Sequence, residues 1–279
     1  MCRYCIEFGN GTKWYLNPNN FRKELYYQEG HSTGFLNLTG VSRNSYEFGF
    51  GDQMDDFISD MNDAPFLNSM MDMQIQHAGQ VVPLEDALKI VDVAPGERFL
   101  LQHCGCRRYM GHEDFYGCLF FDIVCDRTPA EKPWETDSKI ITREEARKVI
   151  KDRHKQGLVI SIFDAGTSAG GKAPLNFCFC SEADCGAHRS RVYLGATASF
   201  KKSEYIAQIN KQKCKDGCKN NPVCLKRCQF GALKFNPMSN TVGVSHVQCF
   251  GCGLCRSSCP TQAIKLVDRT TYPTLVDNW

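Results

Sequence analysis

The hydrophobic pattern places two similar units in the first part of the chain, at residues 83–109 and 141–166. Pro83 suits the first turn of a helix in the first unit. In the second unit, Thr142 and Glu145 have the spacing of a capping box, and apolar residues then recur at helical spacing. The pattern therefore predicts that each unit begins with a helix.

Each predicted helix leads into an apolar run with the length of a strand. These runs are residues 99–102 and 158–163, and Gly157 ends the second helix. The segment 164–175 is rich in Gly, Ala and Ser, which predicts a mobile loop or close packing of the backbone. The two units together predict one α/β domain over residues 1–200.

Each unit leads on to a pair of cysteines separated by one residue, and each pair has a further cysteine downstream. A buried free cysteine often serves as a small apolar residue, and we interpret Cys125 in this way. Two cysteine pairs that end similar units favour a metal centre instead, either an iron–sulfur cluster or a zinc ion. His188 is a further candidate ligand. The candidate cysteine ligands are Cys104, Cys106, Cys118, Cys178, Cys180 and Cys185.

The chain has 279 residues, a length typical of two domains, and 17 of them are cysteines. Secreted proteins pair such cysteines in disulfides. The sequence begins MCRYCIEFGNGTKW, which lacks a signal-peptide pattern, and no apolar run has the roughly 18 residues needed to cross a membrane. We therefore expect reduced, metal-binding thiolates in a cytoplasmic protein of an anaerobe. The net charge of +2 argues against nucleic-acid binding.

The C-terminal part contains the most specific motif. Residues 249–264 read CFGCGLCRSSCPTQAI, with four cysteines at C-x2-C-x2-C-x3-C followed by proline. This is the bacterial-type iron–sulfur ligand run, in which the fourth cysteine ligates a second cluster. Residues 214–235 hold four more cysteines at C-x3-C-x5-C-x3-C and continue in a similar pattern, so the two segments form an internal repeat. Zinc sites usually take cysteines in separated pairs, which makes zinc the weaker interpretation here.

Residues 205–270 resemble a bacterial-type ferredoxin domain with two 4Fe–4S clusters. The resemblance implies a crossed ligand set, although the gaps of the first half are wider and Gln229 stands where the pattern has proline. It implies that one cluster takes Cys214, Cys218, Cys224 and Cys259. It implies that the other cluster takes Cys228, Cys249, Cys252 and Cys255.

A longer stretch, residues 80–270, resembles the 4Fe–4S dicluster-domain proteins of anaerobes, a poorly characterised group. The resemblance is carried by HCGCRRY, GCLFFD, ITREEARKVIKDRHKQGLV and NFCFCSEADC, which all precede the ferredoxin-like segment. This resemblance implies a function in electron transfer.

Three further features leave two interpretations each. Cys2 and Cys5 either complete a metal site or have their spacing by chance. Arg107 and Arg108 either serve a site, by offsetting the charge of a thiolate-bound centre or by holding an anionic ligand, or form an ordinary solvated basic pair. The basic stretch at 211–227 is either a docking face for an acidic redox partner or a loop kept soluble by its lysines.

Together these patterns predict an α+β fold. An α/β domain with cysteine-rich loops at 1–200 precedes a two-cluster ferredoxin-like module at 205–270 and a tail at 271–279. The expected function is single-electron transfer through two 4Fe–4S clusters, to or from a redox partner protein or the N-terminal centre. The alternative is an iron–sulfur reductase, or a reductive activator, with a substrate or catalytic metal site in the N-terminal domain.

Overall fold

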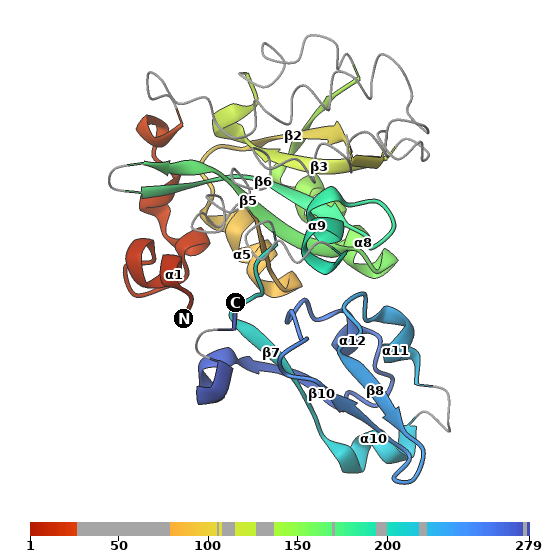
Figure 1. Ribbon diagram of the computed structural model, residues 1–279. Helices are drawn as coiled ribbons and strands as arrows, with labels where there is room; N and C mark the ends of the chain where they lie inside the picture. Colours follow the sequence, from red (N-terminus) through yellow and green to blue (C-terminus); the bar gives the residue numbers. More distant parts are fainter. Residues whose placement is uncertain are drawn as a thin grey trace.

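The structure of the chain is a computed structural model, shown in Figure 1. In the part of the chain that it describes, helices accompany one six-stranded sheet and two two-stranded sheets, which confirms a mixed α+β fold. The residues described are 1–26, 79–104, 106–107, 115–126, 137–168, 171–193, 200–217, 222–275 and 278–279.

The strands of the large sheet are β1 (Gly79–Val81), β2 (Arg98–His103), β3 (Tyr116–Phe121), β4 (Lys139–Thr142), β5 (Val159–Ser168) and β6 (Gly171–Cys180). Their order in the sheet is β1-β5-β6-β3-β2-β4. Alternation of helix and strand is typical of parallel sheets, but every neighbouring pair here is antiparallel. The arrangement therefore differs from the predicted α/β domain, because β3 and β6 lie between the strands of the two units.

Two helices, α5 (Leu84–Val93) and α8 (Arg143–Gln156), contact each other on the side of the sheet nearer the C-terminal region (Figure 1). The capping box of α8 is present: Thr142 Oγ1 accepts a hydrogen bond from Glu145 N at 3.3 Å, and the Glu145 carboxylate accepts one from Thr142 N at 2.8 Å. Gly157 ends α8 with a φ of 93°, a conformation that glycine adopts without strain. The predicted boundaries of this helix are confirmed.

Strands β5 and β6 form one long hairpin, in which Val159 pairs with Cys180 and Thr167 pairs with Lys172. The prediction of a mobile loop at 164–175 is therefore wrong, apart from residues 169 and 170, which lie outside the described residues. Residues of low strand propensity can form these strands because backbone pairing between the two arms holds the hairpin together.

The N-terminal segment completes the core of the sheet. It consists of helix α1 (Arg3–Phe8) and three short 3-10 turns, Trp14–Leu16, Pro18–Phe21 and Lys23–Leu25. Its aromatic residues join the same buried apolar cluster as the strands. Phe121 of β3 lies at the centre, with its ring centroid 5.4 Å from that of Phe21 and 5.3 Å from that of Phe177. These edge-to-face contacts fix the N-terminal segment against the sheet.

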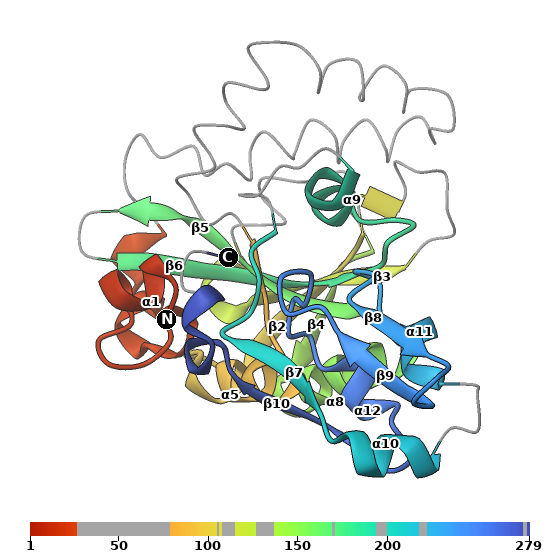
Figure 2. The same cartoon turned by 60° about the horizontal axis from the view of Figure 1, so that its bottom comes forward.

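The C-terminal region forms a separate layer, which lies below the sheet in Figure 1 and in front of it in Figure 2. Its first and last strands, β7 (Tyr205–Ile209) and β10 (Ile264–Asp268), pair antiparallel. A second pair consists of β8 (Leu233–Asn236) and β9 (Thr241–Val244). Three short helices complete it: α10 (Lys211–Gly217), α11 (Val223–Arg227) and α12 (Leu254–Ser257).

Polar contacts join this region to the helices of the large sheet. His154 Nε2 of α8 lies 2.7 Å from Ser257 Oγ of α12, and Arg256 forms an ion pair with Glu85 of α5 at 2.5 Å. Gln229 Nε2 donates to the carbonyl oxygen of Gly157 at 2.7 Å. Among the described residues, no helix is both long and apolar enough to span a membrane.

Candidate metal centres

The cysteines of the C-terminal region gather in its core. Within the part of the chain that is described, six of them belong to one apolar cluster or pack against it, and the seventh, Cys252, packs against a second cluster. The internal repeat thus places its thiols together, as two cysteine-bound clusters in one small module require. Cys218 lies outside the described residues. The others are Cys214, Cys224, Cys228, Cys249, Cys252, Cys255 and Cys259.

Four of these thiols line one hollow. Burial, together with the nearby thiols of Cys249 and Cys228, raises the pKa of Cys252 to about 12. A buried, multi-cysteine site of this kind favours a positively charged centre, because the thiols lose their protons only when a cation joins them. The four residues are Cys228, Cys249, Cys252 and Cys255. They match the ligand set that the ferredoxin resemblance implies for one cluster.

Backbone N–H groups point at this set of sulfurs. Ala207 N donates to Cys249 Sγ at 3.4 Å, and the N–H of Gly251 also lowers the pKa of Cys249 against the larger effect of burial. Gly251 has a φ of 68°, and a Cβ atom there would lie 2.1 Å from Ser203 Oγ. Only glycine fits this close approach, so the residue fixes the shape of the cysteine loop.

Arg269 holds the same loop from behind. Its side chain is 1 % exposed, and its guanidinium donates to the carbonyl oxygens of Cys249 at 2.8 Å, Ser203 at 3.0 Å and Tyr205 at 3.0 Å. A buried guanidinium beside a thiolate-bound centre offsets part of the negative charge of that centre. Sequence analysis did not single out Arg269, because it follows the motif by ten residues.

The other predicted ligand set is supported by fewer contacts. Cys214 Sγ accepts a hydrogen bond from Val242 N at 3.3 Å, and Cys259 Sγ accepts one from Ala263 N at 3.3 Å. Both hydrogen bonds stabilise a thiolate. Gln229, which replaces the proline of the ferredoxin pattern, binds the N-terminal region at Gly157 and at Glu182 N. The departure from the pattern thus has a structural role.

The six cysteines predicted to form an N-terminal centre also come together, and we refer to them as the six-cysteine group. Cys118 of β3 and Cys178 of β6 are register partners with their sulfurs 3.8 Å apart. Cys180 lies two residues along β6 on the same face. Its sulfur is 3.0 Å from that of Cys185, which precedes helix α9 (Gly186–Tyr193).

The first cysteine pair completes the six-cysteine group from the end of β2. Cys104 forms side-chain hydrogen bonds with Cys106 and Cys118. Cys106 Sγ lies 3.6 Å from the position that a Cβ atom on Gly186 would occupy, at the start of α9. Residues from β2, β3, β6 and α9 therefore bring all six predicted ligands to one place.

The pKa values show how these thiols influence one another. The hydrogen bond with Cys185, and then burial, raise the pKa of Cys180 well above its ordinary value. The same hydrogen bond lowers the pKa of Cys185, against burial and with help from the N–H groups of His188 and Ala187. One thiol of the pair thus donates to the other, and further deprotonation needs a cation.

One pair of sulfurs in the six-cysteine group has the separation of two ligands on one metal ion. Two thiolates on one tetrahedral ion, with bonds of about 2.3 Å, lie about 3.8 Å apart. The Cys118–Cys178 pair has this separation. Six thiols exceed the four that one such ion takes, so the six-cysteine group suits a centre with more than one metal ion. Arg107 pairs with Asp184 at 2.6 Å, so it is not an ordinary solvated residue, while Arg108 lies outside the described residues.

An aromatic stack connects the six-cysteine group with the C-terminal region. His188 of α9 stacks on Phe230 with ring centroids 4.9 Å apart, and Phe230 stacks on Phe250 at 3.9 Å. Phe250 directly follows Cys249, and Phe230 lies two residues after Cys228. Both ring nitrogens of His188 are buried without a hydrogen-bond partner among the described residues, and its role as a reserve ligand stays a prediction.

We expect His188 to make the protein sensitive to acid. Burial lowers the pKa of His188 to about 4, so the folded chain stays neutral there while the unfolded chain binds a proton below about pH 6.5. The contribution of neutral His188 to the free energy of unfolding is therefore fully present above pH 6.5. It decreases as the pH falls toward 4, and the loss is about 2 kcal/mol at pH 5. His188→Phe keeps the stack and removes the titration.

Anaerobic calorimetry of the wild type and His188→Phe at pH 7.5 and pH 5 measures this effect. The melting temperature of His188→Phe should fall less between pH 7.5 and pH 5 than that of the wild type. The matched variant His246→Phe, at a half-buried histidine, should change the pH dependence less. Equal losses in the wild type and His188→Phe would contradict the assignment.

The remaining sequence predictions have mixed outcomes. Cys125 is buried in a small apolar cluster with Leu100 and Phe120, as expected for a core residue. Cys2 and Cys5 are both buried, and their sulfurs are 3.4 Å apart. Glu204, which no sequence motif indicated, lies beside them.

Comparison with known proteins identifies one segment. The 4Fe–4S binding domain family matches residues 244–265, which contain the C-x2-C-x2-C-x3-C motif. The match supports a 4Fe–4S cluster and a general role in iron–sulfur electron transfer for this ferredoxin-like region. No curated protein and no solved structure matches the chain. The resemblance of residues 80–270 to the dicluster-domain proteins therefore stays a prediction.

Proposed function

We propose that the protein transfers single electrons through two 4Fe–4S clusters in residues 205–270 and a third, redox-active metal centre in the preceding domain, residues 1–200. Residues 271–279 form a tail. The six-cysteine group holds the third centre. The ligands of one ferredoxin cluster are Cys214, Cys218, Cys224 and Cys259. Those of the other are Cys228, Cys249, Cys252 and Cys255.

The observation that carries this proposal is one apolar cluster that contains parts of both sites. Cys180 and Cys185 of the six-cysteine group belong to it, together with Phe250 and, packed against it, Cys252. Thiols of the two sites are thus separated by packed side chains rather than by solvent. A short path through a dry interior favours electron exchange between the sites over two unrelated structural metals.

The residues around the two sites have defined tasks in this function. Bound clusters would supply one-electron redox chemistry. The N–H of Ala207 and the guanidinium of Arg269 stabilise negative charge near Cys249. The rings of Phe230 and Phe250 exclude water between the sites. Hydrogen bonds, nearby charge and solvent exclusion are the properties by which a protein sets the potential of a cluster.

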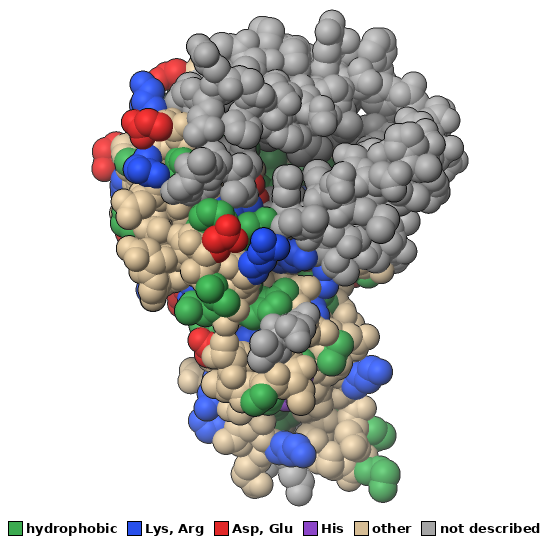
Figure 3. Space-filling view, turned by 60° about the vertical axis from the view of Figure 1, so that its left-hand side comes forward, with side chains coloured by type: hydrophobic (Ala, Val, Ile, Leu, Met, Phe, Trp, Pro, Cys, Tyr) green, Lys and Arg blue, Asp and Glu red, His purple; other side chains and the backbone are tan. Residues whose placement is uncertain are grey.

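The proposal includes an acidic redox partner protein and a reducing, cytoplasmic compartment. Lys211, Lys213 and Lys226 are exposed near the predicted ligands of the first half of the repeat. On the face shown in Figure 3, basic side chains are scattered singly over the lower part of the molecule. Such lysines raise the rate of encounter with an acidic protein.

A second candidate function is enzymatic. The six-cysteine group has more thiols than a closed tetrahedral site uses, and Cys104 and Cys106 are only half buried. A centre that reaches the surface and keeps an open position suits an iron–sulfur reductase or a reductive activator of another enzyme. In that case the ferredoxin-like region feeds electrons to a substrate site.

Iron and acid-labile sulfide per chain, measured on anaerobically purified protein, test the proposal. We expect about twelve irons or more, because two 4Fe–4S clusters account for only about eight. The double variant Cys118→Ala/Cys178→Ala should fall to about eight irons. About eight irons in the wild type would overturn the N-terminal redox centre and leave the C-terminal region as the electron carrier.

A matched variant separates loss of ligands from loss of fold. Cys125→Ala removes a buried cysteine of the same domain that lies outside the six-cysteine group, so its iron content should equal that of the wild type. If Cys125→Ala lost as much iron as the double variant, the six-cysteine group would not be the ligand set.

A further inference from the structure

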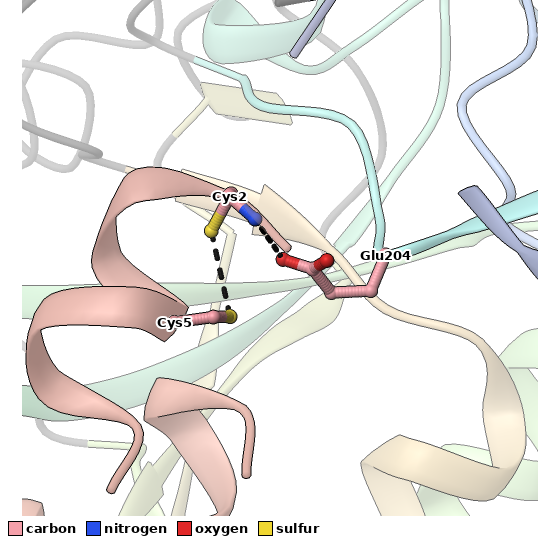
Figure 4. Close-up of side chains that lie close together, drawn as sticks. All are labelled: Cys2, Cys5 and Glu204. Atoms are coloured by element: carbon pink, nitrogen blue, oxygen red, sulfur yellow. Dashed lines mark hydrogen bonds between the residues drawn. The ribbon is translucent and has the colours of Figure 1, made fainter. Parts of the chain in front are cut away.

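Two cysteines and a glutamate from distant parts of the chain meet beneath the large sheet (Figure 4). Cys2 and Cys5 lie at the start of α1, one turn apart and therefore on one face of the helix. Glu204 directly precedes β7. Cys2 is 0 %, Cys5 1 % and Glu204 1 % exposed, and their ligand atoms all lie within 4.8 Å of one another.

The glutamate carries an oxygen that the described residues do not satisfy. Glu204 Oε1 accepts a hydrogen bond from Cys2 N at 2.9 Å. Glu204 Oε2 is buried and has no hydrogen-bond partner in the described part of the chain; the amine of Met1 forms a long ion pair with it at 4.0 Å, and the thiol of Cys5 also interacts with the carboxylate. A buried carboxylate oxygen without a donor is costly, so it indicates a bound cation.

We propose that Cys2, Cys5 and Glu204 bind one zinc ion, at a site separate from the clusters and from the six-cysteine group. The Cys2 and Cys5 sulfurs are 3.4 Å apart, close to the roughly 3.8 Å between two thiolates on one tetrahedral zinc ion. Thiolate and carboxylate oxygen are both zinc ligands. An iron–sulfur cluster needs cysteines spread around several metal atoms, and a single adjacent pair does not provide them.

The charges of the site balance when the ion binds. When Zn²⁺ binds, the two thiols release their protons to solvent, and the resulting complex of two thiolates, one carboxylate and one zinc ion has a net charge of −1. Lys201 lies close enough for the charge of Cys2 to act on its ammonium group. Gln80 Nε2 lies 4.0 Å from Cys2 Sγ and is held by the carbonyl oxygen of Lys202 at 3.1 Å, which orients it toward the ligand.

The position of the site gives the ion a structural task. Glu204 lies between Ser203 and Tyr205, whose carbonyl oxygens accept from Arg269, and Arg269 N in turn donates to the carbonyl oxygen of Glu204 at 2.8 Å. Arg269 also holds Cys249. A zinc ion would therefore fix helix α1 to the segment from which the ferredoxin-like region begins.

Zinc content of the anaerobically purified protein, dialysed against Zn²⁺ and then against buffer, tests this site. Cys2→Ser/Cys5→Ser should contain one zinc ion fewer per chain than the wild type, with unchanged iron and sulfide. Glu204→Gln should lose zinc to a chelator roughly ten times faster or more. The matched variant Cys125→Ser should retain all of its zinc.

X-ray absorption at the zinc edge supplies a second readout that iron does not disturb. We expect two sulfur ligands at about 2.3 Å together with oxygen ligands. Equal zinc in the wild type and Cys2→Ser/Cys5→Ser would overturn the proposal, as would a zinc ion with four sulfur ligands that persists in that variant. Because iron counts test the N-terminal redox centre and zinc counts test this site, the two proposals fail independently.

Discussion

Replacing Cys228 with alanine is expected to lower the iron content by about four atoms per chain and to remove the cluster that we propose Cys252 ligates. Cys228 belongs to the first half of the repeat in sequence, yet it lines the same hollow as Cys249, Cys252 and Cys255. The pKa of Cys255 is raised first by burial and then by the charges of neighbouring thiols, among them Cys228. Removing one of four ligands leaves the cluster without a closed site.

A double variant tests directly whether cysteines from the two halves of the repeat ligate the same cluster. If Cys228 and Cys252 ligate one cluster, Cys228→Ala, Cys252→Ala and the double variant should all lose about four irons. If they ligate different clusters, the double variant should lose about eight. Cys125→Ala provides the control for the loss of a buried thiol. Additive losses in the double variant would contradict the ligand set.

Gly251→Ala is expected to destabilise the C-terminal region by about 3 kcal/mol or more and to release the cluster beside it. Gly251 has a φ of 68°, where an alanine is strained. Its new Cβ would also lie 2.1 Å from Ser203 Oγ and 2.2 Å from the carbonyl oxygen of Tyr205. The backbone there carries the N–H that supports Cys249, so the shift that relieves the clash misplaces a ligand.

Gly231→Ala is the matched control. Gly231 also has a positive φ, 61°, but no atom lies within 4 Å of the position of its Cβ. Gly231→Ala should lose only the backbone contribution to stability, roughly 1–2 kcal/mol, and keep its iron. Thermal unfolding under anaerobic conditions and iron content after gel filtration measure both variants. Equal loss of iron in Gly231→Ala and Gly251→Ala would contradict the role of the close contact.

The parts of the fold predicted from sequence were those specified by neighbouring residues. Thr142, Glu145 and Gly157 define the two ends of α8 within one short segment, and the structure confirms both. The spacing of Cys249, Cys252 and Cys255 is equally local, because the three residues lie on one short loop. For the six-cysteine group, sequence alone indicated the residues but not which thiols would be neighbours. The Cys118–Cys178 pair depends on the register of β3 with β6.

The features missed from sequence depend on contacts between distant segments. Glu204 lies 202 residues from Cys2, and nothing near it in sequence marks it as a ligand. Nothing in the sequence marks Phe230, and the sequence indicated His188 as a candidate ligand but not as the stacking partner of Phe230. The glycines and alanines at 164–175 indicated a loop by composition, whereas pairing with the opposite arm of the hairpin determines their conformation.

The pairing of β7 with β10 has a consequence for how such a chain can arise. Tyr205 and Asp268 are partners in register, so the ferredoxin-like region starts and finishes at the same spot. The chain then turns back, and Trp279 accepts a hydrogen bond from Arg191 of α9 at 3.1 Å. A segment whose ends meet can be inserted into a host polypeptide, or exchanged between hosts, without redirecting the host's own path. Because its two ends lie side by side, the region has a geometry that allows recombination between genes to move it as one unit.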